Sequence, residues 1–171
     1  MFLLLFFIFG IVGESIAIAS PIGEWKFDDG SGRVTQDSSG KGKTGQLFGS
    51  TIKWVTGIRN KALQFFGTQD YVQVDPSIED LTTWSFTAYV KPTDNQGAEQ
   101  YVYSERDVND DVYFYICITD DRRIKIGTRH HLRMGFNNQS EWEFYETDKN
   151  KILQDDWNHL VVTYDGNFYW G

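Results

Sequence analysis

Two aromatic residues close to a run of amides form the first group in this sequence that could bind a ligand. Trp142 and Tyr145 follow shortly after Asn137 and Asn138. Aromatic faces stack on the apolar side of pyranose rings, while amides bind the sugar hydroxyls. Trp142, Tyr145, Asn137 and Asn138 are therefore the predicted ligand-binding residues. Core packing of the two aromatic side chains is the alternative, because most large aromatic residues serve a core.

Acidic turns form a second candidate group, one suited to a hard metal cation, which binds several oxygen ligands. Asp28 and Asp37 lie in Gly- and Ser-rich turns next to the first expected strand, and Asp110 and Asp111 are adjacent in an acidic loop. These four residues are the predicted metal ligands. The alternative for Asp28 and Asp37 is that each stabilises its own turn by accepting backbone N–H hydrogen bonds.

Composition and charge limit the fold and the partners. The 171 residues suit one domain, and aromatic residues make up 16% of them, which favours β-structure. The net charge of −8 repels phosphate backbones, so the sequence predicts no nucleic-acid partner. Cys117 is the single cysteine, which excludes an internal disulfide, and we expect it to be buried in a strand.

Residues 1–19 have the pattern of an export signal. An apolar run extends from Phe2 to Val12, a polar break follows at Glu14, and Ala17 and Ala19 give a small-x-small cleavage pattern. The apolar run is too short to span a bilayer comfortably. The prediction is a cleaved signal peptide over residues 1–19, a secreted domain over residues 20–171, and no stable membrane insertion once the signal has been removed. An uncleaved anchor is the alternative.

The candidate ligand-binding and metal-binding residues must be positioned by the strands and turns of the fold. The sequence consists of short apolar and β-branched runs separated by Gly, Asp, Asn and Ser clusters, a pattern typical of an all-β sandwich. In the run 84–91, alternation places Trp84, Phe86, Ala88 and Val90 on one face, toward the core. The last run is apolar on both faces, as in an interior strand. The expected strands are 23–27, 45–48, 62–65, 71–74, 84–91, 100–104, 112–119, 123–128, 132–136, 142–145 and 157–164.

Six short blocks in a fixed order carry a family resemblance. They are 25–32 (WKFDDGSG), 37–42 (DSSGKG), 61–65 (KALQF), 70–74 (DYVQV), 86–92 (FTAYVKP) and 157–166 (WNHLVVTYDG). Together they resemble the laminin G-like group of the concanavalin A-like lectin/glucanase domains. The resemblance implies a two-sheet antiparallel jelly-roll sandwich whose rim loops or concave face bind glycans or extracellular proteins.

The resemblance also bears on the C-terminal edge of the fold. In the family, the strand that ends in the Val-Thr-Tyr-Asp-Gly pattern is followed by further strands, whereas five residues follow Gly166 here. The expectation is an incomplete jelly roll, with C-terminal strands missing and an open edge that could accept a strand-complementing partner.

Two further expectations depend on relatives of this family. In the related pentraxins an acidic pair before the equivalent strand binds calcium, so Ca²⁺ is the expected cofactor at Asp110 and Asp111. Related glucanases carry Glu-x-Asp-x-x-Glu along one strand, and the nearest pattern here is Glu105, Asp107 and Asp110. It ends in Asp and runs into an expected loop, so the sequence favours a solvated acidic loop over catalytic carboxylates.

The sequence as a whole predicts a secreted, lectin-like recognition module of the kind used in cell adhesion, with no catalytic residues. Its expected ligand is a carbohydrate or an extracellular protein. The alternative is a truncated fragment of a larger adhesin or glycoside hydrolase that has no independent activity.

Overall fold

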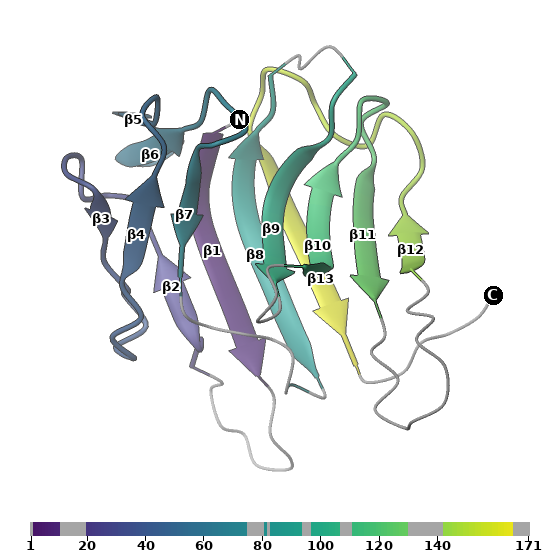
Figure 1. Cartoon of the computed structure of the whole chain (residues 1–171), viewed down its shortest axis with the longest axis horizontal. Coiled ribbons are helices and arrows are strands. Elements are labelled where there is room, and N and C mark those ends of the chain that lie inside the picture. The colour runs from purple at the N-terminus through teal and green to yellow at the C-terminus, as the bar shows by residue number, and fades with distance from the viewer. Residues whose placement is uncertain are drawn as a thin grey trace. The chain divides into compact units, whose positions relative to one another are not determined.

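The computed structural model describes the backbone of residues 2–10, and residues 20–74, 81, 83–93, 97–106, 111–129 and 142–165, except the side chain of Arg129. These residues form strands, turns and bends, with no helix among them, and every strand pairing is antiparallel. The prediction of an antiparallel all-β fold is confirmed (Figure 1). Within the same residues, nothing forms a helix long and apolar enough to cross a membrane.

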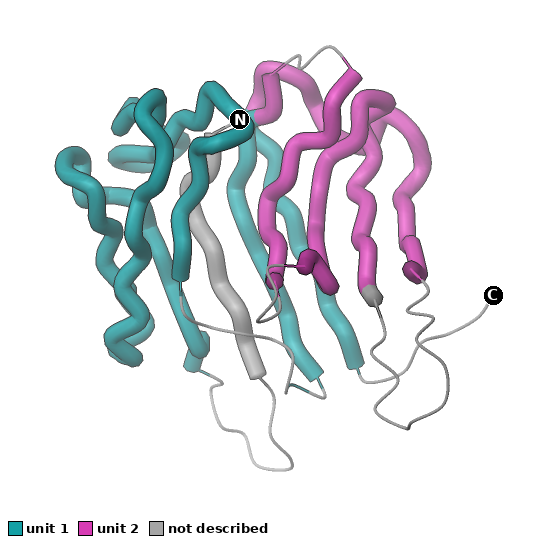
Figure 2. Tube along the Cα trace, viewed as in Figure 1, with its two compact units in different colours: residues 1–91, 157–171 teal, residues 92–156 magenta. Residues whose placement is uncertain are grey.

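Two compact units divide the chain, as the colours of Figure 2 show. Unit 1 contains Met1–Lys91 and Trp157–Gly171, and unit 2 contains Pro92–Asp156. The chain therefore leaves unit 1 once and returns to it for its last described strand.

The larger sheet of unit 1 has six strands. In sheet order they are β13 (Asn158–Tyr164), β8 (Trp84–Lys91), β1 (Phe2–Gly10), β6 (Lys61–Gln64) and β5 (Lys53–Thr56), with β2 (Gly23–Trp25) also paired to β1. β8 alternates as expected: Trp84, Phe86, Ala88 and Val90 are buried and the residues between them are partly exposed. The core face of this strand was thus predicted correctly from its period of two.

The last described strand differs from its expected environment. Leu160 and Val162 of β13 are buried, but Val161 between them is 56% exposed. Among the described residues β13 pairs with β8 alone. Among the described strands β13 therefore lies at the edge of its sheet with one face covered, and the prediction that both of its faces are buried, as in an interior strand, is wrong.

The N-terminal segment is a strand of this sheet in the full chain. β1 lies between β8 and β6, and Figure 1 shows it in purple beside β8. The sequence predicts an export signal here and no strand, so β1 is a feature that the sequence analysis missed. Cleavage after Ala19 concerns the processing of the chain and stays a prediction.

A smaller three-stranded sheet completes unit 1. Its order is β3 (Val34–Thr35), β4 (Gly45–Phe48) and β7 (Tyr71–Gln73). Leu47 on β4 and Thr35 on β3 are buried. Gly49, which directly follows β4, has a φ of 99°, a conformation that glycine adopts without steric cost.

Unit 2 is a four-stranded sheet in the order β12 (Trp142–Glu146), β11 (Ile124–Arg129), β10 (Val112–Ile118) and β9 (Gln100–Arg106). A tight turn joins β10 to β11: Arg122 N–H donates to the Thr119 carbonyl at 3.0 Å, and Arg122 has a φ of 61°. The register then places Lys125 opposite Cys117 and Gly127 opposite Tyr115. Cys117 is fully buried in β10, as expected.

Candidate functional site

Four aromatic rings from three strands of unit 2 form a continuous row, which we call the aromatic face: Tyr101, Tyr115, Trp142 and Phe144. The Tyr115 ring centroid lies 5.3 Å from that of Tyr101 and 5.4 Å from that of Trp142. The Trp142 and Phe144 rings are parallel within 4°, with centroids 5.9 Å apart. The two ends of the row are open to solvent, since Tyr101 is 49% and Phe144 52% exposed, whereas Tyr115 in the middle is buried.

Strand register explains why these rings share one side of the sheet. Successive side chains of a strand point to opposite faces, so Trp142 and Phe144, two residues apart, point the same way. Gly127 lies opposite Tyr115 on β10 and opposite Phe144 on β12. A Cβ at Gly127 would overlap with the Tyr115 ring. Glycine at this position therefore provides the space in which Tyr115 lies across the sheet.

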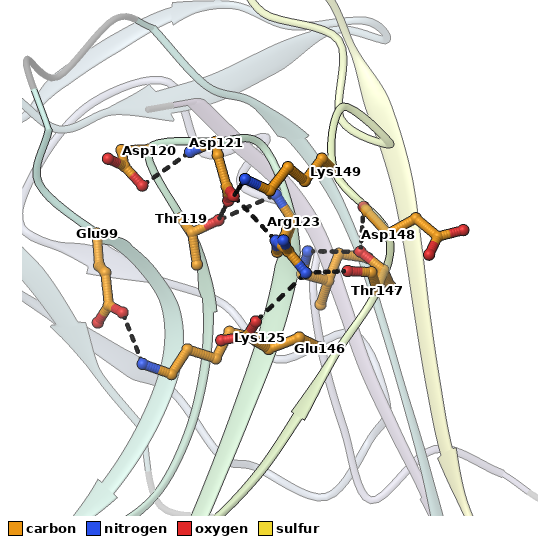
Figure 3. Close-up of polar contacts among 11 residues, drawn as sticks. Glu99, Thr119, Asp120, Asp121, Arg123, Lys125, Glu146, Thr147, Asp148 and Lys149 are labelled. Carbon is orange, nitrogen blue, oxygen red and sulfur yellow. Dashed lines mark hydrogen bonds and ion pairs between the residues drawn. The ribbon is translucent and has the colours of Figure 1, made fainter.

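An ion pair lies at the centre of the aromatic face. Lys125 Nζ is 2.9 Å from Glu99 Oε1, and the Tyr101 hydroxyl donates to Glu99 Oε2 at 3.2 Å. The same ammonium lies over two rings, 4.8 Å from the Phe144 centroid and 5.9 Å from that of Tyr115. Figure 3 shows Lys125 extended toward Glu99. Lys125 thus contacts both the Glu99 carboxylate and the rings of Tyr115 and Phe144.

Ionisation of the groups around this pair is shifted in the directions that the geometry predicts. The hydrogen bond to Glu99 raises the pKa of Lys125 above its ordinary value, although burial opposes this shift. Burial and the nearby Glu99 carboxylate raise the pKa of Tyr101 to about 12. Burial, together with Glu99, also raises the pKa of Cys117 to about 12. Cys117 is therefore a protonated, buried thiol at neutral pH and unsuited to act as a nucleophile.

A polar network next to the ion pair fixes the end of the sheet (Figure 3). Arg123 connects the β10–β11 turn to the end of β12: its Nε is 3.0 Å from Asp121 Oδ2 and its Nη1 is 3.5 Å from Glu146 Oε2. Thr147 exchanges hydrogen bonds with Ile124, through its backbone N–H and its hydroxyl, each at 3.0 Å. Hydrogen bonds from Thr119 and Arg123 lower the pKa of Asp121 to about 2. These contacts hold β11 and β12 in the register that aligns the rings.

The structure separates the residues that the sequence analysis grouped as a sugar platform. Trp142 belongs to the aromatic face, but Tyr145 is three positions away and points to the other side of β12, where its hydroxyl donates to Glu143 at 3.3 Å. Asn137 and Asn138 lie outside the described residues. The sequence analysis missed five residues of the site: Glu99, Tyr101, Tyr115, Lys125 and Phe144.

Two of the four predicted metal ligands, Asp37 and Asp28, accept hydrogen bonds from the protein itself. Asp37 accepts backbone hydrogen bonds from Glu24, Ser39 and Lys43 at 2.8–3.0 Å. Burial acts to raise the pKa of Asp37, but these bonds and one from the Ser39 hydroxyl outweigh it, so the pKa falls well below 3.8. Asp28 accepts from Lys61 N–H and from the Asn60 amide, each at 3.1 Å. The contacts of Asp37 with Ser39 and Lys43 fit the turn-stabilising alternative, whereas Asp28 connects its loop to the start of β6.

The structure shows less about the other two predicted metal ligands, Asp110 and Asp111. Asp111 is exposed at the start of β10, and Asp110 lies outside the described residues. Within the described parts of the chain, no group of three or more His, Cys, Asp or Glu residues is arranged to hold a metal ion. Calcium therefore stays a prediction without a located site.

Glu105, the first carboxylate considered for catalysis, is only 7% exposed on β9. The hydroxyls of Tyr103 and Tyr113 both donate to it. A carboxylate held in this way is poorly placed to face a sugar across open solvent. Asp107 and Asp110 lie outside the described residues.

Comparison with protein families identifies the fold. A laminin G family model, described as the concanavalin A-like lectin/glucanases superfamily, matches residues 66–169, more than half of the 171-residue chain. The chain belongs to this superfamily. The antiparallel sheets described above are consistent with the β-sandwich of concanavalin A-like domains. Comparison with curated proteins and with solved structures gave no match.

Membership of the concanavalin A-like superfamily indicates a module that binds carbohydrate or protein ligands. The matched range contains all four rings of the aromatic face as well as Lys125 and Glu99. Three of the six sequence blocks behind the expected resemblance, at 25–32, 37–42 and 61–65, precede this range. The family assignment therefore depends on residues 66–91 and 157–169 of unit 1 and on unit 2.

Proposed function

We propose that this concanavalin A-like chain is a recognition module that binds carbohydrate on the aromatic face. One observation carries the proposal: four rings form an unbroken row whose two ends, Tyr101 and Phe144, are about half exposed. Rings held in register by a sheet lose little conformational entropy on binding, and the exposed rings of Tyr101 and Phe144 provide contact area. A single exposed ring would not provide such a surface.

The chemistry of the face fits a neutral sugar. Ring faces stack on the C–H side of a pyranose, and the Tyr101 hydroxyl, the Lys125 ammonium and the Glu99 carboxylate can bind its hydroxyls. Lys125 is neutralised by Glu99 at 2.9 Å, so it does not present a free positive charge. The chain also carries a net charge of −8, which repels anionic ligands.

The proposal includes an extracellular location and binding without hydrolysis. Residues 1–19, with their apolar run and small-x-small pattern, support export. The buried environment of Glu105, occupied by two tyrosine hydroxyls, supports binding over catalysis. N-terminal sequencing of the exported protein tests the first point, and assay of reducing sugar released from a bound glycan tests the second.

Glycan-array screening of the full chain, followed by titration calorimetry with the best neutral hit, tests the site. We expect Phe144→Ala and Trp142→Ala each to weaken binding about tenfold or more, because an aromatic side chain that contacts the ligand contributes about 1.4 kcal/mol or more. Phe66→Ala is the matched control. Phe66 is 55% exposed in unit 1, with Lys53 Nζ 5.1 Å from its ring.

Equal loss in all three variants, or unchanged affinity in Trp142→Ala and Phe144→Ala with native thermal midpoints, would contradict the proposed site. Calcium is tested in the same titration. If the predicted calcium contributes, EDTA must lower either the glycan affinity or the thermal midpoint, because a ligand of the native state stabilises it by mass action.

A further inference from the structure

Strand β1 is the only link between two halves of the larger sheet in the described part of the chain. Along one edge it pairs with β8 from Phe2 opposite Lys91 to Gly10 opposite Trp84. Along the other edge it pairs with β6 at two positions and with β2 at three. Among the described residues, no other pairing joins β13 and β8 to β5, β6 and β2.

Loss of β1 would therefore open the middle of the sheet. The edges of β8, β6 and β2 would each lose backbone partners, and unpaired backbone N–H and C=O groups that stay buried cost free energy. Residues on these edges are fully buried in the full chain: Ala62 and Leu63 on β6, and Ala88 and Val90 on β8, have no exposed surface. The gap would expose an apolar interior as well as unpaired backbone.

The sequence of β1 suits an interior strand. Residues 2–9 are eight apolar residues in succession, FLLLFFIF, and strands buried on both faces have such continuous apolar runs. The apolar core of an export signal requires the same kind of run. The same segment thus meets the sequence requirements of an interior strand and of an export signal. A molecule from which the segment has been cut and removed can no longer use it as a strand.

We propose that the space between β8 and the β6–β2 edge is a strand-binding groove, and that residues 2–10 of the same chain are its occupant. The groove takes an extended apolar segment of about eight residues that runs antiparallel to β8. Because pairing on both edges holds the segment, the groove keeps it after the covalent link through residues 11–19 has been cut. The groove lies in unit 1 and is independent of the aromatic face.

A cross-strand disulfide in the full chain tests the register. Phe9 lies opposite Ser85, and Phe7 lies opposite Thr87. Phe9→Cys with Ser85→Cys joins directly opposed residues, whose Cα atoms are about 4.5–5.5 Å apart in antiparallel pairs. The matched control, Phe9→Cys with Thr87→Cys, is displaced by two residues on the same strand, where Cα separations of about 7–8 Å are too long for a disulfide. Cys117 is fully buried and does not compete.

We expect a closed-loop monomer on non-reducing gels for the first pair and a free-thiol monomer for the control. Equal yields from the two pairs, or no cross-link in either, would overturn the proposal. A cross-linked dimer from the first pair would also overturn it, because the occupant would then be the N-terminal segment of a second copy.

Cutting the folded chain tests whether the groove binds its strand without the covalent link. A protease site inserted between Gly13 and Glu14 allows cleavage after folding. We expect the N-terminal fragment to coelute with the remainder on size exclusion and to separate in denaturant. Phe6→Pro should release the fragment, because proline removes a ladder N–H from a central strand, whereas Phe6→Leu should retain it. Release of the unsubstituted fragment in buffer would overturn the proposal.

Discussion

A phenylalanine ring with a lysine ammonium over it occurs in both units, but the surroundings of the two pairs differ. Phe66 in unit 1 and Phe144 in unit 2 are 55% and 52% exposed, with Lys53 and Lys125 ammonium groups 5.1 and 4.8 Å from their ring centroids. In the described part of the chain, Phe66 has no aromatic neighbour, whereas Phe144 stacks on Trp142. A half-exposed phenylalanine beneath a lysine is thus an isolated contact in one unit and part of a row of four rings in the other.

The carboxylates of the two units differ in a parallel way. Asp37 in unit 1 accepts three backbone N–H groups and therefore fixes a turn. Glu99 in unit 2 accepts instead from two side chains, the Lys125 ammonium and the Tyr101 hydroxyl. A carboxylate bound to movable side chains can exchange them for a ligand, but one bound to backbone groups cannot do so without loss of the turn. The comparison favours unit 2 as the place of recognition.

The largest expected effect comes from filling the space beneath Tyr115. An alanine Cβ at Gly127 overlaps with the Tyr115 ring, so Gly127→Ala must displace the ring or the strand. We expect a loss of about 1–3 kcal/mol in the free energy of unfolding, the usual cost of overpacking, together with weaker glycan binding. Denaturant unfolding and calorimetric titration measure the two effects.

Gly67→Ala is the matched control in unit 1. Its nearest added contact is Thr51 Oγ1 at 3.8 Å, an ordinary van der Waals distance. The change in unfolding free energy should be within about 0.5 kcal/mol, as for a surface substitution. If Gly127→Ala is as harmless as Gly67→Ala, the Tyr115 ring does not lie across the sheet at that position.

Asp37 gives the next largest effect and a defined pH dependence. Asp37→Asn removes a charged acceptor from three backbone donors, so we expect a loss of about 1–2 kcal/mol at pH 7. The pKa of Asp37 in the folded chain lies below 3.8, so the unfolded chain takes up the proton first as the pH falls. The stabilisation is complete above about pH 5 and is lost progressively below about pH 4.

Chemical denaturation of the wild type and of Asp37→Asn between pH 7 and 2.5 measures this difference, which should shrink on the acid side. Asp29→Asn is the control, because Asp29 accepts from a single backbone group, Gln36 N–H, at 3.3 and 3.4 Å. A pH-independent difference for Asp37→Asn would mean that its carboxylate charge does not contribute to stability.

Much of the fold could be predicted from sequence because strand alternation and turn chemistry are local. The buried set on β8 follows from its period of two, and the turn role of Asp37 is one of the two alternatives that the sequence indicates. Strand β3, which is only two residues long, was missed, and so was the four-residue strand β5. The exposure of Val161 depends on whether another layer covers its face of the sheet, and its apolar character alone does not show that.

The candidate site could be predicted only in part, for a similar reason. Trp142 was found because tryptophan is conspicuous, but Phe144, two residues away, was passed over for Tyr145, three residues away. The period of a strand was a sufficient signal to choose Phe144. Tyr101 and Glu99 join the site through pairing of β9 with β10, a register shifted by bulges that no local pattern indicates.

The smallest expected effect is the difference in stability between substitutions of Lys125 and of Lys53. Lys125→Gln removes the partner of Glu99, whose side chain is 32% exposed, so we expect a loss of about 0.5–1 kcal/mol in unfolding free energy that decreases with added salt. Lys53→Gln should change stability by less than about 0.5 kcal/mol, since its described contact is a single exposed ring. Glycan affinity should fall only in Lys125→Gln, because that lysine holds both the carboxylate and the rings. If the two variants lose the same stability and the same affinity, Glu99 and the neighbouring rings contribute nothing beyond the lysine–phenylalanine contact that is also present in unit 1.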